Sequence, residues 1–126
     1  MKQNNNALIR KLSEKGVRFP APESVEIGKD VDPNRISGKG AVIHSGCKIY
    51  GQSTLICDDT QIGLEGPATI VDCQIGSRVE LGGGFYKDAV FLTGASAGSG
   101  AHIREGTILE EEASIAHTVG LKQTIL

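Results

Sequence analysis

Three histidines, His44, His102 and His117, have the clearest chemical potential in this chain of 126 residues. A neutral imidazole can take a proton from a hydroxyl or an amine, and three imidazoles with one water can hold a catalytic zinc ion. His102 and His117 are fifteen residues apart and His44 lies far upstream, so no metal site is expected. His117 follows Ile115 by two residues and is the best candidate for a general base. Its alternative is an ordinary surface or subunit-contact histidine, and we assign no catalytic residue.

Two glycine-rich segments and an acidic run offer weaker chemistry. Gly94–Gly100 could cradle a phosphate, but the Lys-Ser or Lys-Thr pair that a P-loop needs does not follow it. Gly82–Tyr86 predicts a turn that leaves the regular structure, with Tyr86 able to support a subunit contact. Glu110–Glu112 could act in acid–base or metal chemistry, although three adjacent carboxylates are usually a solvated surface. We therefore expect no cofactor.

Composition argues against several classes of partner. The formal net charge is −2 and the pI about 5.9, so the chain lacks the basic surface that nucleic acids need. No polybasic run indicates a membrane surface, and no stretch approaches the ~20 apolar residues of a membrane span. The N-terminus lacks the apolar core of a signal peptide. Neither nucleic acid nor membrane is expected as a partner.

Cysteine usage predicts a cytoplasmic protein. Cys47, Cys57 and Cys73 make an odd count without C-x-x-C spacing, which is typical of reduced thiols. Cys47 follows Ile43 by four residues, which predicts an inward thiol that packs as a small hydrophobic group.

The elements that must position these residues repeat every six positions. Aliphatic residues stand six apart, and a second small or aliphatic residue follows each by four: Ile103, Leu109, Ile115 and Leu121, then Thr107, Ala113, Val119 and Ile125. Neither the 3.6-residue period of a helix nor the two-residue period of a strand gives this pattern. A six-residue repeat is typical of a parallel β-helix, whose coils pair with those above and below. We predict an all-β fold of this kind, with function on its faces, ends and partners.

Upstream, the same rule predicts an irregular start near Val25 and one slip of register. The slip, at Ile56, is needed to keep Asp59 out of the core. Further on, Leu81 should point inward together with Phe85. Twenty-two residues separate Leu81 from Ile103, four more than three hexads, and we expect this surplus to leave the coil as a loop near Gly94–Gly100.

Residues 1–24 are predicted to form a short helix and a linker, and residues 25–126 the β-helix. Asn6 can cap a helix over residues 7–15, and Gly16 suits the left-handed position that follows a helix. Leu8, Ile9 and Leu12 give this helix one apolar face, which must pack on the first coil because so short a helix is unstable alone. The last residues, 124–126, carry no cap. We expect that the natural protein continues with further coils or that the chain associates end to end through this one.

The hexads of the form Ile/Leu/Val-Gly-x-x-small-x resemble those of the hexapeptide-repeat superfamily over residues 25–126. The resemblance implies a single-stranded left-handed β-helix that usually forms trimers. Acyltransferases, the C-terminal domains of nucleotidyltransferases and γ-class carbonic anhydrases share this fold. The acyltransferases place a histidine base between subunits, the role that His117 would take. The carbonic anhydrases use a histidine pair five residues apart, which this chain lacks.

Two segments are similar to narrower families. Residues 12–28 resemble the helix and linker that precede the β-helix of bacterial N-acetylglucosamine-1-phosphate uridyltransferases. Residues 106–124 resemble UDP-N-acetylglucosamine pyrophosphorylase-related proteins, whose β-helix continues further. The glycine-rich nucleotide loop of a nucleotidyltransferase catalytic domain is absent from the sequence. A sugar-nucleotide ligand is therefore expected only with a further domain.

These observations lead to one hypothesis and two alternatives. The leading hypothesis is a non-catalytic β-helical oligomerisation module, or fragment, of a sugar-nucleotide pyrophosphorylase-related protein, which forms a homo-oligomer, either a trimer or an end-to-end assembly. The first alternative is an acyl-CoA-dependent acyltransferase acting on a sugar or an amine, with His117 as base. The second is a metal protein like the γ-class carbonic anhydrases. If the chain is an enzyme, we expect a transferase.

Overall fold

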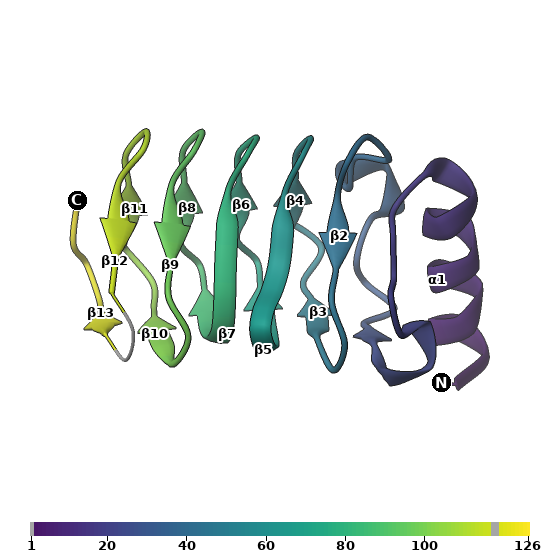
Figure 1. Cartoon of the computed structure of the whole chain (residues 1–126). Coiled ribbons are helices and arrows are strands. Elements are labelled where there is room, and N and C mark those ends of the chain that lie inside the picture. Colours follow the sequence, from purple (N-terminus) through teal and green to yellow (C-terminus); the bar gives the residue numbers. More distant parts are fainter. Residues whose placement is uncertain (1, 117–118) are drawn as a thin grey trace.

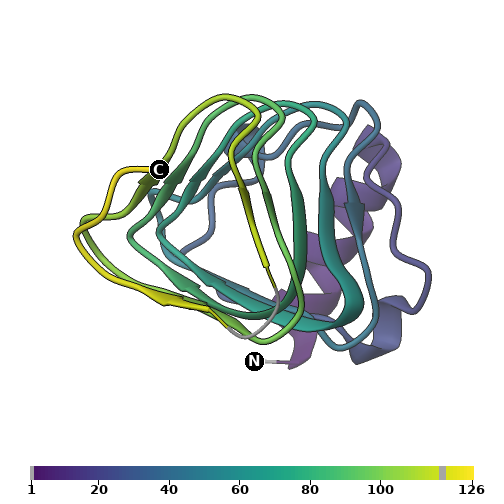
Figure 2. The same cartoon turned by 60° about the vertical axis from the view of Figure 1, so that its left-hand side comes forward.

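The computed structural model describes residues 2–116 and 119–126, with side chains from residue 5 onward. The chain winds as a left-handed β-solenoid of about five turns, with one short helix at its N-terminal end (Figure 1). Seen closer to the axis, the coils are three-sided and enclose a single core (Figure 2). The predicted all-β fold with an N-terminal helix is confirmed.

The strands stack in three faces, which we call A, B and C. Face A contains β2 (Val42–Ile43), the first parts of β5 (Gln61–Val71) and β7 (Glu80–Lys87), β9 (Ser96–Ala97) and β12 (Ser114–Ile115). Face B contains β1 (Glu26–Ile27), β3 (Lys48–Tyr50), the second parts of β5 and β7, β10 (Ala101–Ile103) and β13 (Gly120–Leu121). Face C contains β4 (Leu55–Ile56), β6 (Gln74–Ile75), β8 (Val90–Phe91) and β11 (Ile108–Leu109). These pairings are all parallel, and β5 and β7 join faces A and B into one sheet.

Helix α1 (Lys2–Lys15) covers the N-terminal end of the solenoid (Figure 1). It begins before the predicted start, so Asn6 lies inside the helix and the predicted cap is wrong. Ile9 and Leu12 are buried against the first coil, and Gly16 has the expected left-handed φ of +123°. The short 3-10 helices η1 (Pro22–Ser24) and η2 (Pro33–Arg35) lie in the irregular segment that follows.

The core consists of inward residues that stack from coil to coil. The buried ones are Ile43, Ile62, Leu81, Ala97 and Ile115 on face A, Ile27, Ile49, Ile70, Tyr86 and Ile103 on face B, and Ile36, Ile56, Ile75, Phe91 and Leu109 on face C. The predicted hexad residues Ile103, Leu109 and Ile115 are therefore inside, and Leu121 is half-buried. Asp59 is exposed at a corner with φ of 58°, so the predicted slip of register is confirmed.

The predicted loop at Gly94–Gly100 is wrong. This segment contains β9, which pairs with β7 on one side and β12 on the other. Leu81 and Ile103 are separated by four sides of the prism, because Tyr86, Phe91 and Ala97 are the inward residues between them. The steps from Leu81 to Tyr86 and from Tyr86 to Phe91 are five residues each, one fewer than a hexad. The 22 residues therefore fill four sides, and none are left over to form a loop.

The predicted turn at Gly82–Tyr86 is also wrong. These residues lie inside β7, and the inward aromatic is Tyr86 rather than Phe85. Tyr86 is fully buried, donates a hydrogen bond from Oη to the carbonyl O of Gly82 at 2.8 Å, and meets the Phe91 ring edge-on at 5.7 Å. It therefore cannot support the predicted subunit contact. The glycines before it admit the backbone of the next coil, since an added Cβ on Gly84 would lie 2.3 Å from the carbonyl O of Ala101.

Candidate functional site

The structure does not bring the described histidines together. His44 follows β2 on face A, where its Nε2 lies 2.7 Å from Oε1 of Gln61. His102 lies in β10 on face B, and its exposed ring packs at a tilt on Phe85 with 5.1 Å between centroids. Among the described residues, no group of three histidine, cysteine, aspartate or glutamate side chains is placed to hold a metal ion. His117, the predicted base, lies outside the described residues.

The other predicted candidates form ordinary parts of the wall. Gly94–Gly100 contributes two corners and a strand, with no free loop around a phosphate. Glu110–Glu112 is exposed at a corner, as expected for a solvated surface segment. Glu112 reaches Arg78 at 3.2 Å across the intervening Gly94, but both side chains are more than half exposed, so this ion pair contributes little to stability.

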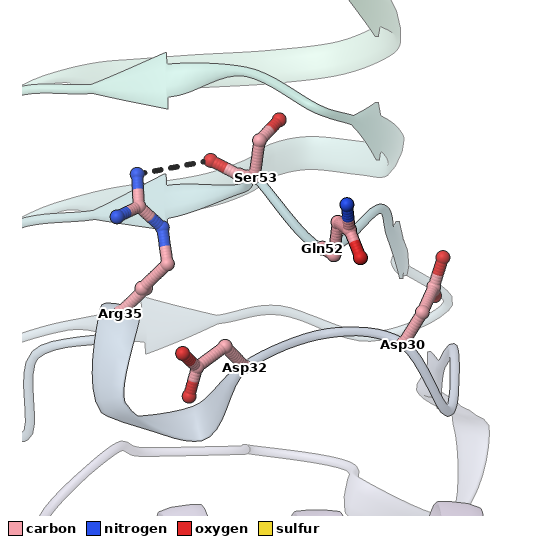
Figure 3. Close-up of a pocket in the computed structure, with 5 residues that line it drawn as sticks. All are labelled: Asp30, Asp32, Arg35, Gln52 and Ser53. Atoms are coloured by element: carbon pink, nitrogen blue, oxygen red, sulfur yellow. Dashed lines mark hydrogen bonds between the residues drawn. The ribbon is translucent and has the colours of Figure 1, made fainter.

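A hollow of about 520 Å³ opens near the start of face C (Figure 3). The five residues that line it all have polar side chains: Asp30, Asp32, Arg35, Gln52 and Ser53. Arg35 donates from Nη2 to the carbonyl O of Ser53 at 3.2 Å, and to Oε1 of Gln74 at 3.1 Å. Asp32 accepts a hydrogen bond from the backbone N–H of Asn34, at the start of η2. Because small-molecule sites usually have an apolar wall, and these groups already hold the backbone, the hollow is a poor ligand site.

A second, narrower groove of about 250 Å³ runs along face A. Glu65, Glu80, Ser96 and Ser114 supply polar side chains to its walls, and Gly82 and Gly98 belong to its lining. Carboxylates and hydroxyls in such an arrangement could orient an amine or a hydroxyl compound. Ile115, two residues before His117, also lines the groove.

Face C carries a row of outward aliphatic side chains that the predictions missed. Leu55, Val90 and Ile108 occupy equivalent outward positions, with the polar Gln74 between Leu55 and Val90, and Leu92 lies beside Val90 in the neighbouring row. We call these four residues the face-C patch. Leu92 is 39% exposed and the other three are half-buried. Ile125 extends the row, because it bridges to Ile108 and is 65% exposed.

The outward rows of the other faces are polar by comparison. On face A the outward row contains one aliphatic residue, Val42, followed by Gln61, Glu80, Ser96 and Ser114, and on face B it contains Glu26, Lys48, Thr69, Phe85 and His102. A signal for the patch exists in the sequence, since adjacent apolar pairs occur in three of the four strands of face C, Leu55-Ile56, Val90-Phe91 and Ile108-Leu109, and the fourth strand has Gln74-Ile75. One member of each pair faces inward and the other outward. The predictions followed only the inward member.

Burial and hydrogen bonding perturb several acidic protons. Burial raises the pKa of the Cys73 thiol to about 11. The hydrogen bond that Tyr50 donates to Oε2 of Glu26, at 2.6 Å, raises the pKa of Tyr50 to about 12. Burial also raises the pKa of Tyr86 and of the Cys47 thiol. A raised thiol pKa disfavours the reactive thiolate, so Cys47 and Cys73 are structural residues rather than nucleophiles.

These shifts predict that the free energy of unfolding falls as the pH rises from about 9 to about 12. The folded state holds the protons of Cys73 and Tyr50 more tightly than the unfolded state, so this contribution is complete below the unfolded pKa values of 9.0 and 10.0 and is lost above them. Cys73 alone contributes at most about 3 kcal/mol. Urea unfolding at several pH values with a reductant would measure the loss, and Cys73→Ala should reduce it. A constant free energy across this range would contradict the assignment.

The structure also shows the state of the cysteines and the character of the helices. Among the described residues the cysteines are free thiols, Cys47 and Cys73 buried and Cys57 half-buried. The helices that the structure describes include none with the length and apolar character needed to cross a membrane.

The chain is similar to curated proteins over almost its whole length, although no family model matches it. It is 30% identical to the bifunctional protein GlmU of Pelobacter propionicus over an alignment of 122 positions that covers 93% of this chain and 24% of that protein. It is 31% identical to GlmU of Oleidesulfovibrio alaskensis, over 96% of this chain and 25% of that protein. It is 33% identical to GlmU of Thermotoga petrophila, over 94% of this chain and 25% of that protein.

The chain thus spans about a quarter of the length of the curated relatives that it matches. The hexads, the stacked inward rows and these similarities agree with one another. The chain is a hexapeptide-repeat β-helix with distant homology to the bifunctional GlmU proteins.

Proposed function

We propose that this chain is a non-catalytic β-helical module of a sugar-nucleotide pyrophosphorylase-related protein, and that its direct role is to associate with further copies of itself. The observation that carries the proposal is the face-C patch. Among the described residues, the exposed large hydrophobic side chains are Leu92, Ile125 and Leu126. Leu92 and Ile125 lie in outward rows of face C, whereas Leu126 follows the inward row of Leu109. Their concentration on one face of a regular surface is typical of an interaction site.

A second copy is the partner that fits this patch best. Stacked strands repeat at about 4.8 Å, so the patch of one copy and the rows of another have the same spacing and can interlock. The formal net charge of −2 is too small to keep two copies apart. The four patch residues are uncharged, while the guanidinium of Arg35 reaches Gln74 between Leu55 and Val90, and Glu110 follows Leu92 in its row.

Leu92→Glu tests the proposal. Burying an unpaired carboxylate in the interface should weaken self-association by about 100-fold, because the centre of an interface tolerates truncation or charge least. Size-exclusion chromatography with light scattering would report the molar mass of the native chain and of the variant. We expect an oligomer for the native chain and a monomer for the variant.

Thr69→Glu is the control, because it places the same carboxylate at an outward strand position of face B. It should leave the molar mass of the native chain unchanged. A monomeric native chain, or a Leu92→Glu variant with the native molar mass, would contradict the proposal.

A second candidate function is favoured by the groove on face A. In this hypothesis the groove forms one wall of an acyl-CoA-dependent acyltransferase site, with His117 as base and the carboxylates of Glu65 and Glu80 orienting an amine or sugar acceptor. Acetyl-CoA binding, measured by calorimetry, separates the two functions. Undetectable binding at millimolar ligand would remove the second candidate.

The cellular location is part of the same proposal. We place the protein in the cytoplasm, because the two buried thiols are compatible with a reducing compartment and the described structure pairs no cysteines.

A further inference from the structure

Among the described residues, β1 is the first strand of face B and pairs with β3 along one of its two edges. Toward β3, the N–H of Glu26 donates to the carbonyl O of Cys47 at 3.0 Å, and the N–H of Gly28 donates to that of Ile49 at 2.8 Å. The carbonyl O of Val25 and the N–H of Ile27 belong to the other edge. An open edge of this kind is a template for pairing with another chain.

The side chain of Asn5 occupies this edge from helix α1. Its Oδ1 accepts a hydrogen bond from the N–H of Ile27 at 2.5 Å, and its Nδ2 donates to the carbonyl O of Val25 at 3.1 Å. In a parallel ladder, one residue of a strand donates to the residue before its partner and accepts from the residue after it. Asn5 makes this same pair of bonds around Glu26, with a side-chain amide in place of a backbone peptide group.

We propose that Asn5 is an edge cap that denies the N-terminal strand edge of the solenoid to a second copy of this chain. A second copy is the competing partner because each of its strands carries the same donor and acceptor spacing, and its hydrophobic core would continue the inward row that begins at Ile27. Ile9 and Leu12 fill the apolar end of the prism, but their side chains cannot satisfy backbone groups. Helix α1 covers this end of the solenoid (Figure 1), and within the described structure the carboxamide of Asn5 is the group that satisfies the two backbone groups of the edge.

Asn5→Ala tests the proposal, and Asn6→Ala is its matched control, because Asn6 is the exposed neighbour on the same helix. Both substitutions are made in the full chain and also in a Leu92→Glu background, which keeps association through the end separate from association through face C. Sedimentation velocity over a range of concentrations measures assembly. Hydrogen exchange followed by NMR measures protection of the Ile27 amide.

In either background, Asn5→Ala should form species larger than those of its parent, growing with concentration, while Asn6→Ala should match the parent. The Ile27 amide should exchange about tenfold faster in Asn5→Ala than in the native chain when both are dilute. An Asn5→Ala chain that stays at the parental size would overturn the proposal. If that variant fails to fold, Asn5→Asp keeps the acceptor and loses the donor, and should show a weaker form of the same assembly. An Ile27 amide that exchanges rapidly in the native chain would also overturn it, whatever the variants do.

Discussion

Tyr86→Ala should lower the free energy of unfolding by about 3–5 kcal/mol, whereas Phe85→Ala should lower it by only about 1 kcal/mol. Tyr86 is fully buried in the axial core, where its ring contacts Phe91. Phe85 is partly exposed on face B and packs on the exposed ring of His102. The two aromatics are neighbours in the sequence, so the comparison isolates the direction in which each side chain points.

Urea or thermal unfolding followed by circular dichroism would measure both effects. Tyr86→Phe separates the ring from the hydroxyl, because it keeps the packing and leaves the carbonyl O of Gly82 without the 2.8 Å hydrogen bond. It should cost about 1–2 kcal/mol. Equal losses for Tyr86→Ala and Phe85→Ala, or a larger loss for Phe85→Ala, would show that the register of β7 is wrong.

Gly84→Ala is the second substitution with a large expected effect, a loss of about 3 kcal/mol. The added Cβ would lie 2.3 Å from the carbonyl O of Ala101, which is backbone of the next coil and cannot rotate away. The strands β7 and β10 would have to separate, and this displacement would disturb the packing of the coils stacked on them.

Gly120→Ala is the matched control, since Gly120 lies in β13 on the same face and the nearest described atom to its added Cβ is the carbonyl O of His102, at 3.7 Å. Replacing a strand glycine without a clash should leave stability unchanged or slightly higher. Thermal unfolding of the two variants side by side would test the stacking of β7 on β10. The prediction fails if Gly84→Ala melts at the temperature of the native chain.

The fold was predictable where the sequence keeps a strict period of six. Ile103, Leu109 and Ile115 stand inside because each is a large aliphatic at an unbroken spacing. The prediction failed between Leu81 and Ile103, where Ala97 holds an inward position that a search for large aliphatics does not recognise. There the small inward side chain of Ala97 leaves room for the large rings of Tyr86 and Phe91. The two steps that lead from Leu81 to Phe91 are also one residue shorter than a hexad. Sequence spacing alone does not reveal this exchange of volume.

The outer surface was harder to predict than the core. The histidines were candidates for a shared site because imidazoles can act as bases or metal ligands, yet His44 and His102 lie on different faces. The face-C patch depends on which member of an aliphatic pair faces outward, and that becomes clear only when the register of the coils is known. The edge cap was missed for a related reason, since Asn5 acts through contacts with residues more than twenty positions away.

The central claim, that copies of this chain meet through face C, is tested most directly at Cys57. This half-buried thiol lies in the same outward row as Leu92, two coils away, or about 10 Å along the axis. The measurement is the rate of its labelling by a neutral maleimide as the native chain is diluted, with Cys47 and Cys73 buried and silent. Our account predicts slow labelling at high concentration and labelling at the rate of the Leu92→Glu variant after dilution. Identical rates at every concentration, equal to those of the variant, would contradict it.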